Sequence, residues 1–399
     1  MRLLNVQTLL LESFDGSRVP EYAALSHTWG EEEVSFQDIT TGAGRDKAGW
    51  TKILGAAAKT KKMDLEYIWV DTCCIDKSSS AELSEAINSM YRWYERCVYC
   101  LAYLNDVHPP PKKLIEVIEV DLQPVSHPPL EPCDSRVPPG FLEARWFKRG
   151  WTLQELLAPG EVIFYDSSWN NIGYKSGLSE EISGITGIDQ ITINSRKEIN
   201  RRSIAQRMSW ASKRETTRVE DIAYCLMGLF GINMPLLYGE GDKAFIRLQE
   251  EIIKREWDHT IFAWDDKFLP SVLKVDTLLL GVLAPHPCTF RNCSQIVSLS
   301  RNRTPYAATN IGLNISLPLL KTSLRGKPSS YFAILECKDL SDLKNIMGIP
   351  VRHLYFKEGI EFWRIANKNN RLYLLDMPAS QKIYLQQTGY LFYGDISVR

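Results

Sequence analysis

The sequence predicts an α/β protein: a parallel sheet flanked by helices, followed by a helical segment and a β-rich carboxy-terminal domain. Three observations lead to this fold class. Short, continuously apolar runs alternate with helical patterns over roughly the first 170 residues, which is typical of parallel strands buried on both faces. Amphipathic helical patterns dominate the middle of the chain, and strand and turn signals dominate it from about residue 269. We therefore expect domains at 1–180, 181–268 and 269–399.

Four strand–helix alternations define the predicted sheet. The expected strands are Tyr22–Ser26, Tyr67–Asp71, Val98–Leu104 and Glu161–Tyr165, with a further strand at the amino terminus. The expected helices are Ala48–Lys61, a helix opened by the capping box Ser79-x-x-Glu82, and Trp151–Leu157. The proline-rich insertion 109–140 interrupts the alternation, and we expect an exposed loop there with one candidate strand at Leu114–Val120.

The later elements follow the same kind of signal. Expected helices are Arg201–Ala211, Ile222–Phe230 behind the capping box Thr217-x-x-Glu220, and Lys243–Lys254 with Asp242 as its cap. Expected strands are Leu278–Leu283, Gly312–Leu317, Tyr331–Cys337, Arg371–Leu375 and Ile383–Leu385.

Composition excludes several classes of protein. The 399 residues are 44% hydrophobic and 24% charged, which is ordinary for a globular protein. The net charge of -1 argues against a nucleic-acid partner or an anionic membrane surface. The uncharged stretch Ile222–Gly239 contains glycines and a proline, so we expect a buried helix and loop there rather than a membrane span. The nine cysteines follow no disulfide framework and the amino terminus lacks a signal peptide, so we expect a cytoplasmic protein with reduced thiols.

The most informative local pattern is a tryptophan followed four residues later by a glutamate. Trp151 and Glu155 stand one helical turn apart, so an indole and a carboxylate would share one patch. Other polar and aromatic residues follow the predicted strands at their carboxyl ends, where open α/β sheets bind ligands. These residues are Ser26, His27, Trp29, Asp71 and Asp76. The sequence therefore predicts a ligand site at this edge of the sheet.

Three sequence blocks resemble those of the fungal heterokaryon-incompatibility (HET) domain. They are Ala24-Leu25-Ser26-His27-Thr28-Trp29-Gly30, Tyr67-Ile68-Trp69-Val70-Asp71-Thr72-Cys73-Cys74-Ile75-Asp76 and Arg149-Gly150-Trp151-Thr152-Leu153-Gln154-Glu155-Leu156. The resemblance covers about residues 20–170, and the middle segment is similar to the region that often follows a HET domain. The chain departs from the usual blocks at His27, where Tyr is more typical, and at Lys77, where Gln is.

The resemblance implies an effector of non-self recognition and programmed cell death, an innate immune role in fungi. HET domains are considered distant relatives of Toll/interleukin-receptor (TIR) domains, so the implied fold is a TIR- or flavodoxin-like sheet. In TIR enzymes a Glu four residues after a Trp cleaves NAD+, and here Trp151 and Glu155 match that spacing, with Thr152 in place of Cys.

Carried over residue by residue, Glu155 would be the catalytic carboxylate of an NAD+ glycohydrolase. Its binding residues would be Ser26, Trp29, Gly30, Asp71 and Trp151. NAD+ would be a substrate, and neither a cofactor nor a metal is expected. By analogy with TIR enzymes we expect self-association or protein partners. The alternative is a non-enzymatic signalling scaffold that recruits partners, with Glu155 serving only to fix its helix.

Other constellations favour structural roles. Ser26 and His27 are adjacent on a strand, so their side chains diverge and do not form a hydrolase pair. Packing explains three further patterns better than catalysis or metal binding: the Cys73-Cys74 pair near His27, Cys97-x-x-Cys100, and the cluster His286, Cys288 and Cys293. We interpret Gly239-x-Gly241 as a turn that enters a helix and the basic run Arg196–Arg218 as a solvated face.

Overall fold

The chain forms two compact units, Met1–Arg196 and Lys197–Arg399. The computed structural model describes residues 1–109, 137–269, 282–299, 306–309, 312–322, 330–341, 346–355, 361–365, 373–375 and 393–398. The three predicted domain ranges stay predictions. Of the predicted strands, Leu114–Val120 and Ile383–Leu385 lie outside the described residues, as does most of Leu278–Leu283.

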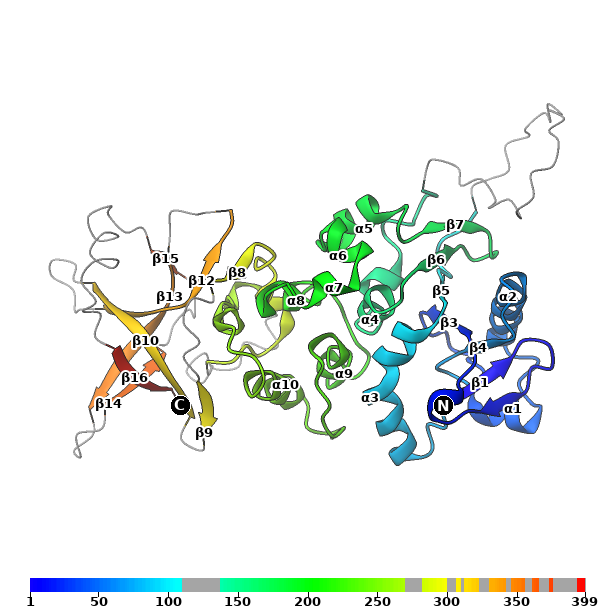
Figure 1. The fold of residues 1–399 in the computed structure, drawn as a ribbon, viewed down its shortest axis with the longest axis horizontal. Coiled ribbons are helices and arrows are strands. Elements are labelled where there is room, and N and C mark those ends of the chain that lie inside the picture. Colours follow the sequence, from blue (N-terminus) through cyan, green and yellow to red (C-terminus); the bar gives the residue numbers. More distant parts are fainter. Residues whose placement is uncertain are drawn as a thin grey trace, which may run out of the picture. The chain divides into compact units, whose positions relative to one another are not determined.

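The first unit is built on a seven-stranded sheet in the order β2-β1-β4-β3-β5-β6-β7 (Figure 1). Its strands are β1 (Arg2–Asn5), β2 (Leu11–Ser13), β3 (Tyr22–His27), β4 (Tyr67–Trp69), β5 (Tyr99–Tyr103), β6 (Val162–Tyr165) and β7 (Asn171–Tyr174). The four central strands, β4, β3, β5 and β6, are parallel, and β1, β2 and β7 pair antiparallel at the two sides. The predicted α/β class with a parallel sheet is confirmed.

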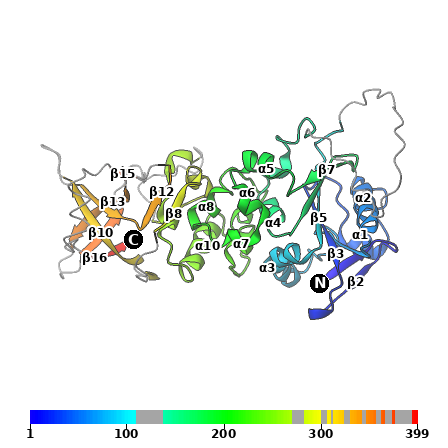
Figure 2. The ribbon, with the colours of Figure 1, turned by 45° about the horizontal axis from the view of Figure 1, so that its top comes forward.

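The order of the parallel strands decides where the helices go. The helices of this unit are α1 (Phe36–Thr41), α2 (Ala48–Lys62), α3 (Ser80–Arg96), α4 (Thr152–Leu157), α5 (Ser179–Thr186) and α6 (Gln190–Asn194), and α7 (Arg196–Ile199) follows at the boundary. The first parallel strand, β3, lies between the second, β4, and the third, β5. Because parallel crossovers are right-handed, the step from β3 to β4 and the step back to β5 place their helices on opposite faces. Both views show α1 and α2 on one side of the sheet and α3 and α4 on the other (Figures 1 and 2).

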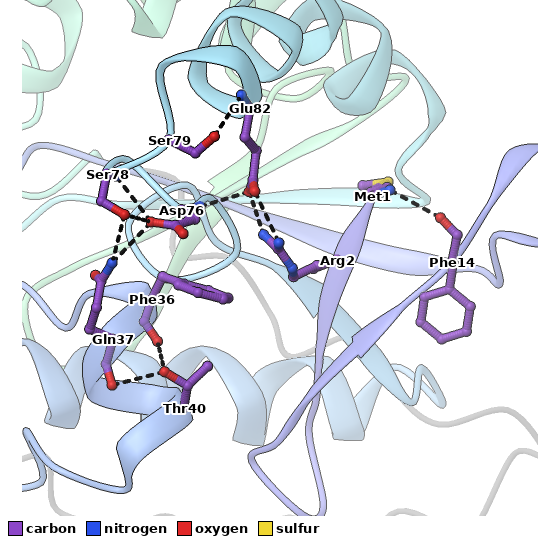
Figure 3. Close-up of polar contacts among 10 residues, drawn as sticks. All are labelled: Met1, Arg2, Phe14, Phe36, Gln37, Thr40, Asp76, Ser78, Ser79 and Glu82. Atoms are coloured by element: carbon purple, nitrogen blue, oxygen red, sulfur yellow. Dashed lines mark hydrogen bonds and ion pairs between the residues drawn. The ribbon is translucent and has the colours of Figure 1, made fainter.

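The loop between β4 and α3 is fixed by a polar network (Figure 3). Ser79 caps α3 by accepting from the Glu82 amide at 3.3 Å, but the Glu82 side chain does not complete the predicted capping box. It pairs with Arg2 and accepts from the Asp76 amide at 2.8 Å. The Asp76 carboxylate accepts from Gln37 Nε2 at 2.9 Å. This network ties β1 and α1 to the segment that follows β4.

One part of the core of the unit lies between the sheet and α3. The apolar face of that helix is directed to the sheet, with Ala86, Ile87, Met90 and Tyr94 buried. Trp69 of β4 is fully buried and packs edge-on against Tyr94, with ring centroids 5.3 Å apart. Each fully buried large apolar side chain contributes about 1.5–3 kcal/mol.

The second unit combines short helices with antiparallel sheets. Its α-helices are α8 (Ile204–Ser209), α9 (Asp221–Tyr224) and α10 (Lys243–Ile253). One sheet has the order β14-β13-β11-β10-β16, with β15 on β13 and β9 on β10, and the other pairs β12 with β8. The strands are β8 (Ile296–Ser298), β9 (Ala307–Thr309), β10 (Gly312–Thr322), β11 (Ser330–Ile334), β12 (Cys337–Asp339), β13 (Ile346–Tyr355), β14 (Glu361–Ile365), β15 (Tyr373–Leu375) and β16 (Tyr393–Val398). The predicted helical segment and β-rich part are therefore present. Among the described residues, every helix is too short or too polar to cross a bilayer.

Two helix starts in this unit differ from the prediction. The expected helix at Arg201–Ala211 begins only at α8, because Ser203 and Gln206 form a capping box there. The predicted capping box of Thr217 and Glu220 is wrong, since Glu220 itself stands at the N-cap of α9. The Glu220 carboxylate instead accepts from the amides of Gly239 and Gly241, at 2.7 and 3.1 Å. Those glycine amides are therefore used within the fold, as the interpretation of a structural turn requires.

In the first unit, α2 approaches the segment between β6 and β7 through a glycine. A Cβ atom built on Gly55 would lie 2.1 Å from Nε1 of Trp169. The Trp169 ring is stacked on Tyr103 at the end of β5, with centroids 4.7 Å apart, so it has little room to retreat. Close packing of this helix thus depends on the missing side chain.

We predict that Gly55→Ala destabilises the protein by about 2 kcal/mol, although alanine is the better helix former. The matched control is Gly184→Ala in α5, where a new Cβ meets no heavy atom within 4 Å. That variant should be neutral or up to about 1 kcal/mol more stable. Urea unfolding of both variants checks the pair. Equal stability changes would contradict the packing described here.

Candidate functional site

The carboxyl end of β3 is the natural ligand position in this sheet. In doubly wound sheets, ligands bind where consecutive crossovers leave to opposite faces, at the carboxyl ends of the strands. Here that point lies between β3 and β5, where Ser26 and His27 pair with Ala102 and Tyr103. The predicted site residues must therefore be sought around these two positions.

Glu155 is held by a chain of hydrogen bonds on the α4 side of the sheet. Its Oε2 accepts from the hydroxyl of Ser26, and Ser26 Oγ accepts from Nε1 of Trp146 at 2.7 Å. Ser26 and Trp146 are fully buried, and Glu155 is 6% exposed. A carboxylate removed from water costs folding free energy unless donors satisfy it, and this chain supplies one with fixed direction. Ser26 and Glu155, two of the residues named from the sequence, are thus in direct contact.

The backbone before α4 explains how Glu155 reaches that position. The Thr152 hydroxyl donates to the carbonyl oxygens of Trp146 and Arg149, the latter at 2.9 Å. This ties the start of α4 to the preceding turn, Arg145–Lys148, which carries Trp146. Trp151 has a helical backbone, with φ -60° and ψ -35°, and is half-buried. Its side chain therefore lies on the same helix face as Glu155, one turn earlier.

A second polar group lies on the α2 side of β3. The His27 side chain faces two carboxylates, with Nε2 3.5 Å from Glu33 Oε2 and Nδ1 3.9 Å from Asp71 Oδ1. Lys52 of α2 binds both carboxylate oxygens of Glu33 at 2.6 Å. Ser26 and His27 thus point to opposite faces, as their adjacent positions on a strand require.

Burial and charge act together in this second group. Burial lowers the pKa of His27, the charge of Lys52 lowers it further, and Glu33 and Asp71 only partly oppose the shift. Burial alone would raise the pKa of Glu33, but His27 and Lys52 outweigh it and hold that pKa far below its usual range. His27 is therefore a neutral imidazole near neutral pH, beside an ionised Glu33.

Trp29 and Gly30 lie at the surface, outside the buried chain of hydrogen bonds that holds Glu155. The Trp29 side chain is 42% exposed, and its Nε1 donates to Asp71 Oδ2 at 2.9 Å. Lys77 Nζ lies 3.7 Å from the centroid of the Trp29 ring, and Arg149 Cζ lies 5.0 Å from it. The Gly30 amide donates to Glu33 Oε1 at 2.7 Å, so this backbone group closes a turn.

Several residues of the site were not predicted from the sequence. Trp146, Glu33 and Lys52 carry no local motif, because their roles arise from contacts with distant parts of the chain. Tyr94 of α3 is another such residue. Burial raises its pKa well above the usual value, and the charges of Glu155 and then Asp71 raise it further. Both carboxylates therefore act on the same buried phenol.

The cysteines support the structural interpretation. The described cysteines are free thiols, and all but Cys288 are buried. Contact with Cys74 and burial raise the pKa of Cys73 well above its usual value, and burial raises that of Cys97 to about 12. Such thiols are poor nucleophiles. Among the residues the structure describes, no group of three or more His, Cys, Asp or Glu side chains is arranged to hold a metal ion.

Because the pKa of His27 is lowered in the folded protein, the free energy of unfolding should depend on pH. Below its ordinary pKa of 6.5 the unfolded chain takes up a proton that the folded His27 resists, so folding stability falls as the pH drops. The loss is at most about 1.4 kcal/mol per pH unit. We expect His27→Gln to flatten the decline in free energy of unfolding between about pH 7.5 and about pH 5.5. His108→Gln, at an exposed position, is the control and should leave the slope unchanged. A parent-like slope in His27→Gln would contradict the prediction.

Comparison with known proteins finds family models and a relative that match parts of this chain. The family model for the heterokaryon incompatibility protein (HET) matches residues 22–155, which include every predicted site residue. A second model, a domain of unknown function (DUF8212), matches residues 243–278. The chain is 42% identical over 240 residues to the vegetative incompatibility protein HET-E-1 of Podospora anserina, which is 59% of this chain and 16% of that protein. No solved structure matches the chain. The first unit therefore contains a region that matches the HET family, and the chain spans about a sixth of the length of the relative it resembles.

Proposed function

We propose that the protein is an effector of vegetative incompatibility and cell death that acts by hydrolysing NAD+ at Glu155. The role in incompatibility rests on the family match and on the name of the relative. The enzymatic part rests on one observation: a buried carboxylate, oriented by Ser26 and Trp146, at the carboxyl end of β3. Carboxylates buried at such a point in a sheet are candidates for functional groups.

The reaction needs few catalytic groups from the protein. The bond between nicotinamide and ribose breaks, nicotinamide leaves with the bonding electrons, and positive charge develops on the sugar as in glycoside hydrolysis. Glu155 stabilises this charge, water adds to the anomeric carbon, and its proton passes to solvent. The products are nicotinamide and ADP-ribose. A hydrogen bond from Ser26 keeps the carboxylate in one orientation, which is the preorganisation that such stabilisation needs.

The low exposure of Glu155 adds a condition to this proposal. At 6% exposure the carboxylate does not face solvent in this conformation. The ribose must therefore gain access by a displacement of the Trp151 side chain or of the start of α4, on substrate binding or on self-association. The fold offers such a point, because α4 has six residues and Gly150 directly precedes its N-cap residue, Trp151.

One contact in the structure supports the alternative, a non-enzymatic scaffold. The Ser26–Glu155 contact joins β3 to α4, so the carboxylate could serve only to fix this helix beneath a recruiting surface. In that case the charge would be dispensable. A glutamine side chain could still accept the Ser26 hydrogen bond and hold the helix.

Glu155→Gln therefore separates the two functions. We predict that the purified protein releases nicotinamide from NAD+ and that Glu155→Gln lowers the rate by about a hundredfold or more while it unfolds at nearly the parent temperature. Glu180→Gln, at an exposed position of α5, is the matched control and should keep the parent rate. The assay is run dilute and concentrated, so that activation by association is detected.

Nicotinamide release that persists in a folded Glu155→Gln variant would remove Glu155 from the mechanism. Absence of release from the full chain and from residues 1–196, provided that the shorter chain folds, would support the scaffold. The shorter chain is a reasonable test because Met1–Arg196 forms a compact unit.

A further inference from the structure

His27 and Asp71 leave polar atoms facing each other without a partner. His27 Nδ1 and Asp71 Oδ1 lie 3.9 Å apart, and among the described residues neither forms a hydrogen bond. The His27 side chain is 1% exposed, so its nitrogens have no ready access to bulk water. Buried polar groups without partners weaken a fold and are uncommon in proteins. A hydroxyl group between them could donate to the carboxylate and accept from the neutral imidazole.

The same Asp71 carboxylate connects this pair to two cations at the surface. Its Oδ2 accepts from Trp29 Nε1 at 2.9 Å, and the Trp29 ring lies against Lys77 Nζ and Arg149 Cζ, at 3.7 and 5.0 Å from its centroid. Cation–π contacts with one indole hold two like charges close together. An anion bound between them would relieve their repulsion, and Arg149 has the planar donors that suit phosphate oxygens.

The charge of Lys77 is available for such a ligand. Lys52, the other lysine of this region, is bound to both oxygens of Glu33. Lys77 is exposed and, in the part of the chain that the structure describes, lies beyond ion-pair distance of every carboxylate. Its ammonium group lies on the face of Trp29. Burial lowers the pKa of this group, and the charges of Asp71, Cys73 and Glu33 partly oppose the shift.

We propose that His27, Trp29, Asp71, Lys77 and Arg149, here called the Trp29 cluster, bind a phosphorylated sugar. Lys77 and Arg149 bind the phosphate oxygens, and the His27–Asp71 pair binds a sugar hydroxyl. Trp29 serves as the support that holds the two cations and orients Asp71, rather than as a stacking surface. The proposal deepens the proposed function, because NAD+ carries ribose attached to a diphosphate, but it is tested by binding alone.

The first test is calorimetric titration of the full chain with ADP-ribose, which lacks the bond that would be cleaved. We expect binding that Lys77→Gln weakens by about tenfold or more, because the amide keeps the side chain's polarity without its charge. His27→Phe should weaken binding to a similar degree, because phenylalanine cannot form the hydrogen bond with the sugar hydroxyl. Lys148→Gln is the matched control: this exposed lysine directly precedes Arg149 in the chain, and its variant should bind like the parent. Binding should also weaken with added salt.

Titrations with ribose 5-phosphate and inorganic phosphate separate the two halves of the site. Tighter binding of ribose 5-phosphate, lost in His27→Phe, supports the hydroxyl position, and equal affinities for both probes overturn it. Absence of ADP-ribose binding at millimolar concentration overturns the whole site, as does binding that a folded Lys77→Gln variant leaves unchanged.

The Glu155→Gln variant keeps the two proposals distinct. It should bind ADP-ribose like the parent, because Glu155 lies on the other face of β3. Lys77-dependent binding without nicotinamide release would refute the glycohydrolase and leave the sugar phosphate site standing. The opposite result is also informative. If nicotinamide release depends on Glu155, but Lys77→Gln changes neither ADP-ribose binding nor the KM for NAD+, the sugar phosphate site is refuted and the glycohydrolase stands.

Discussion

The parallel pairing of β3 between β4 and β5 is the constraint on which the rest of this unit depends. With the first strand in the middle, the crossover from β3 to β4 lies on one face and the crossovers to β5 and β6 lie on the other, and polar residues from both faces meet the end of β3. Successive residues of that strand then meet different environments. Ser26 contacts Trp146 and Glu155 on the α4 side, whereas His27 meets Glu33, Asp71 and Lys52 on the α2 side.

The buried Glu155 carboxylate is a cost that the fold carries at this position. Burying a carboxylate is unfavourable even when it is hydrogen-bonded, and an apolar side chain of similar size would pack there without that cost. A purely mechanical link between β3 and α4 does not need a charge, since a glutamine amide could accept from Ser26 equally well. The presence of an ionisable group on a rigid donor chain, at the point where α/β sheets bind ligands, therefore favours chemistry over support.

The sequence was sufficient to predict the central elements of the first unit, although not α1, α5, α6, β2 or β7, because the signals of those central elements are local. The alternation of apolar runs with amphipathic helices predicts β3, α2, α3, β5, α4 and β6, and the separation of Ser26 from His27 follows from strand geometry alone. Contacts between distant residues could not be obtained in this way. Trp146 reaches Ser26 across 120 positions of sequence and Lys52 reaches Glu33 across 19, with no motif to announce either contact.

Capping signals failed for a related reason. A capping box requires only a serine or threonine and a glutamate at the right spacing, but the glutamate has other partners in the folded chain. The Glu82 carboxylate binds Arg2 and accepts from the Asp76 amide, and the Glu220 carboxylate accepts from two glycine amides. At Ser79 the helix still begins where the spacing predicts, but its glutamate stabilises the neighbouring loop; at Thr217 the predicted cap is absent altogether.

The division of polar groups between the two faces also separates chemistry from recognition in the scheme proposed here. The carboxylate lies on one face with Ser26 and Trp146, and the Trp29 cluster begins on the other face and ends at the surface. His27 and Lys77, the two positions at which the chain departs from the residues typical of the HET blocks, both belong to the Trp29 cluster, and neither contacts Glu155. A chain could therefore change the ligand that it admits, through an imidazole and an ammonium group, without disturbing the donors that orient its carboxylate. Tyr94, whose pKa is raised first by burial and then by the charges of Glu155 and Asp71, is buried between these two groups and separates them within the core.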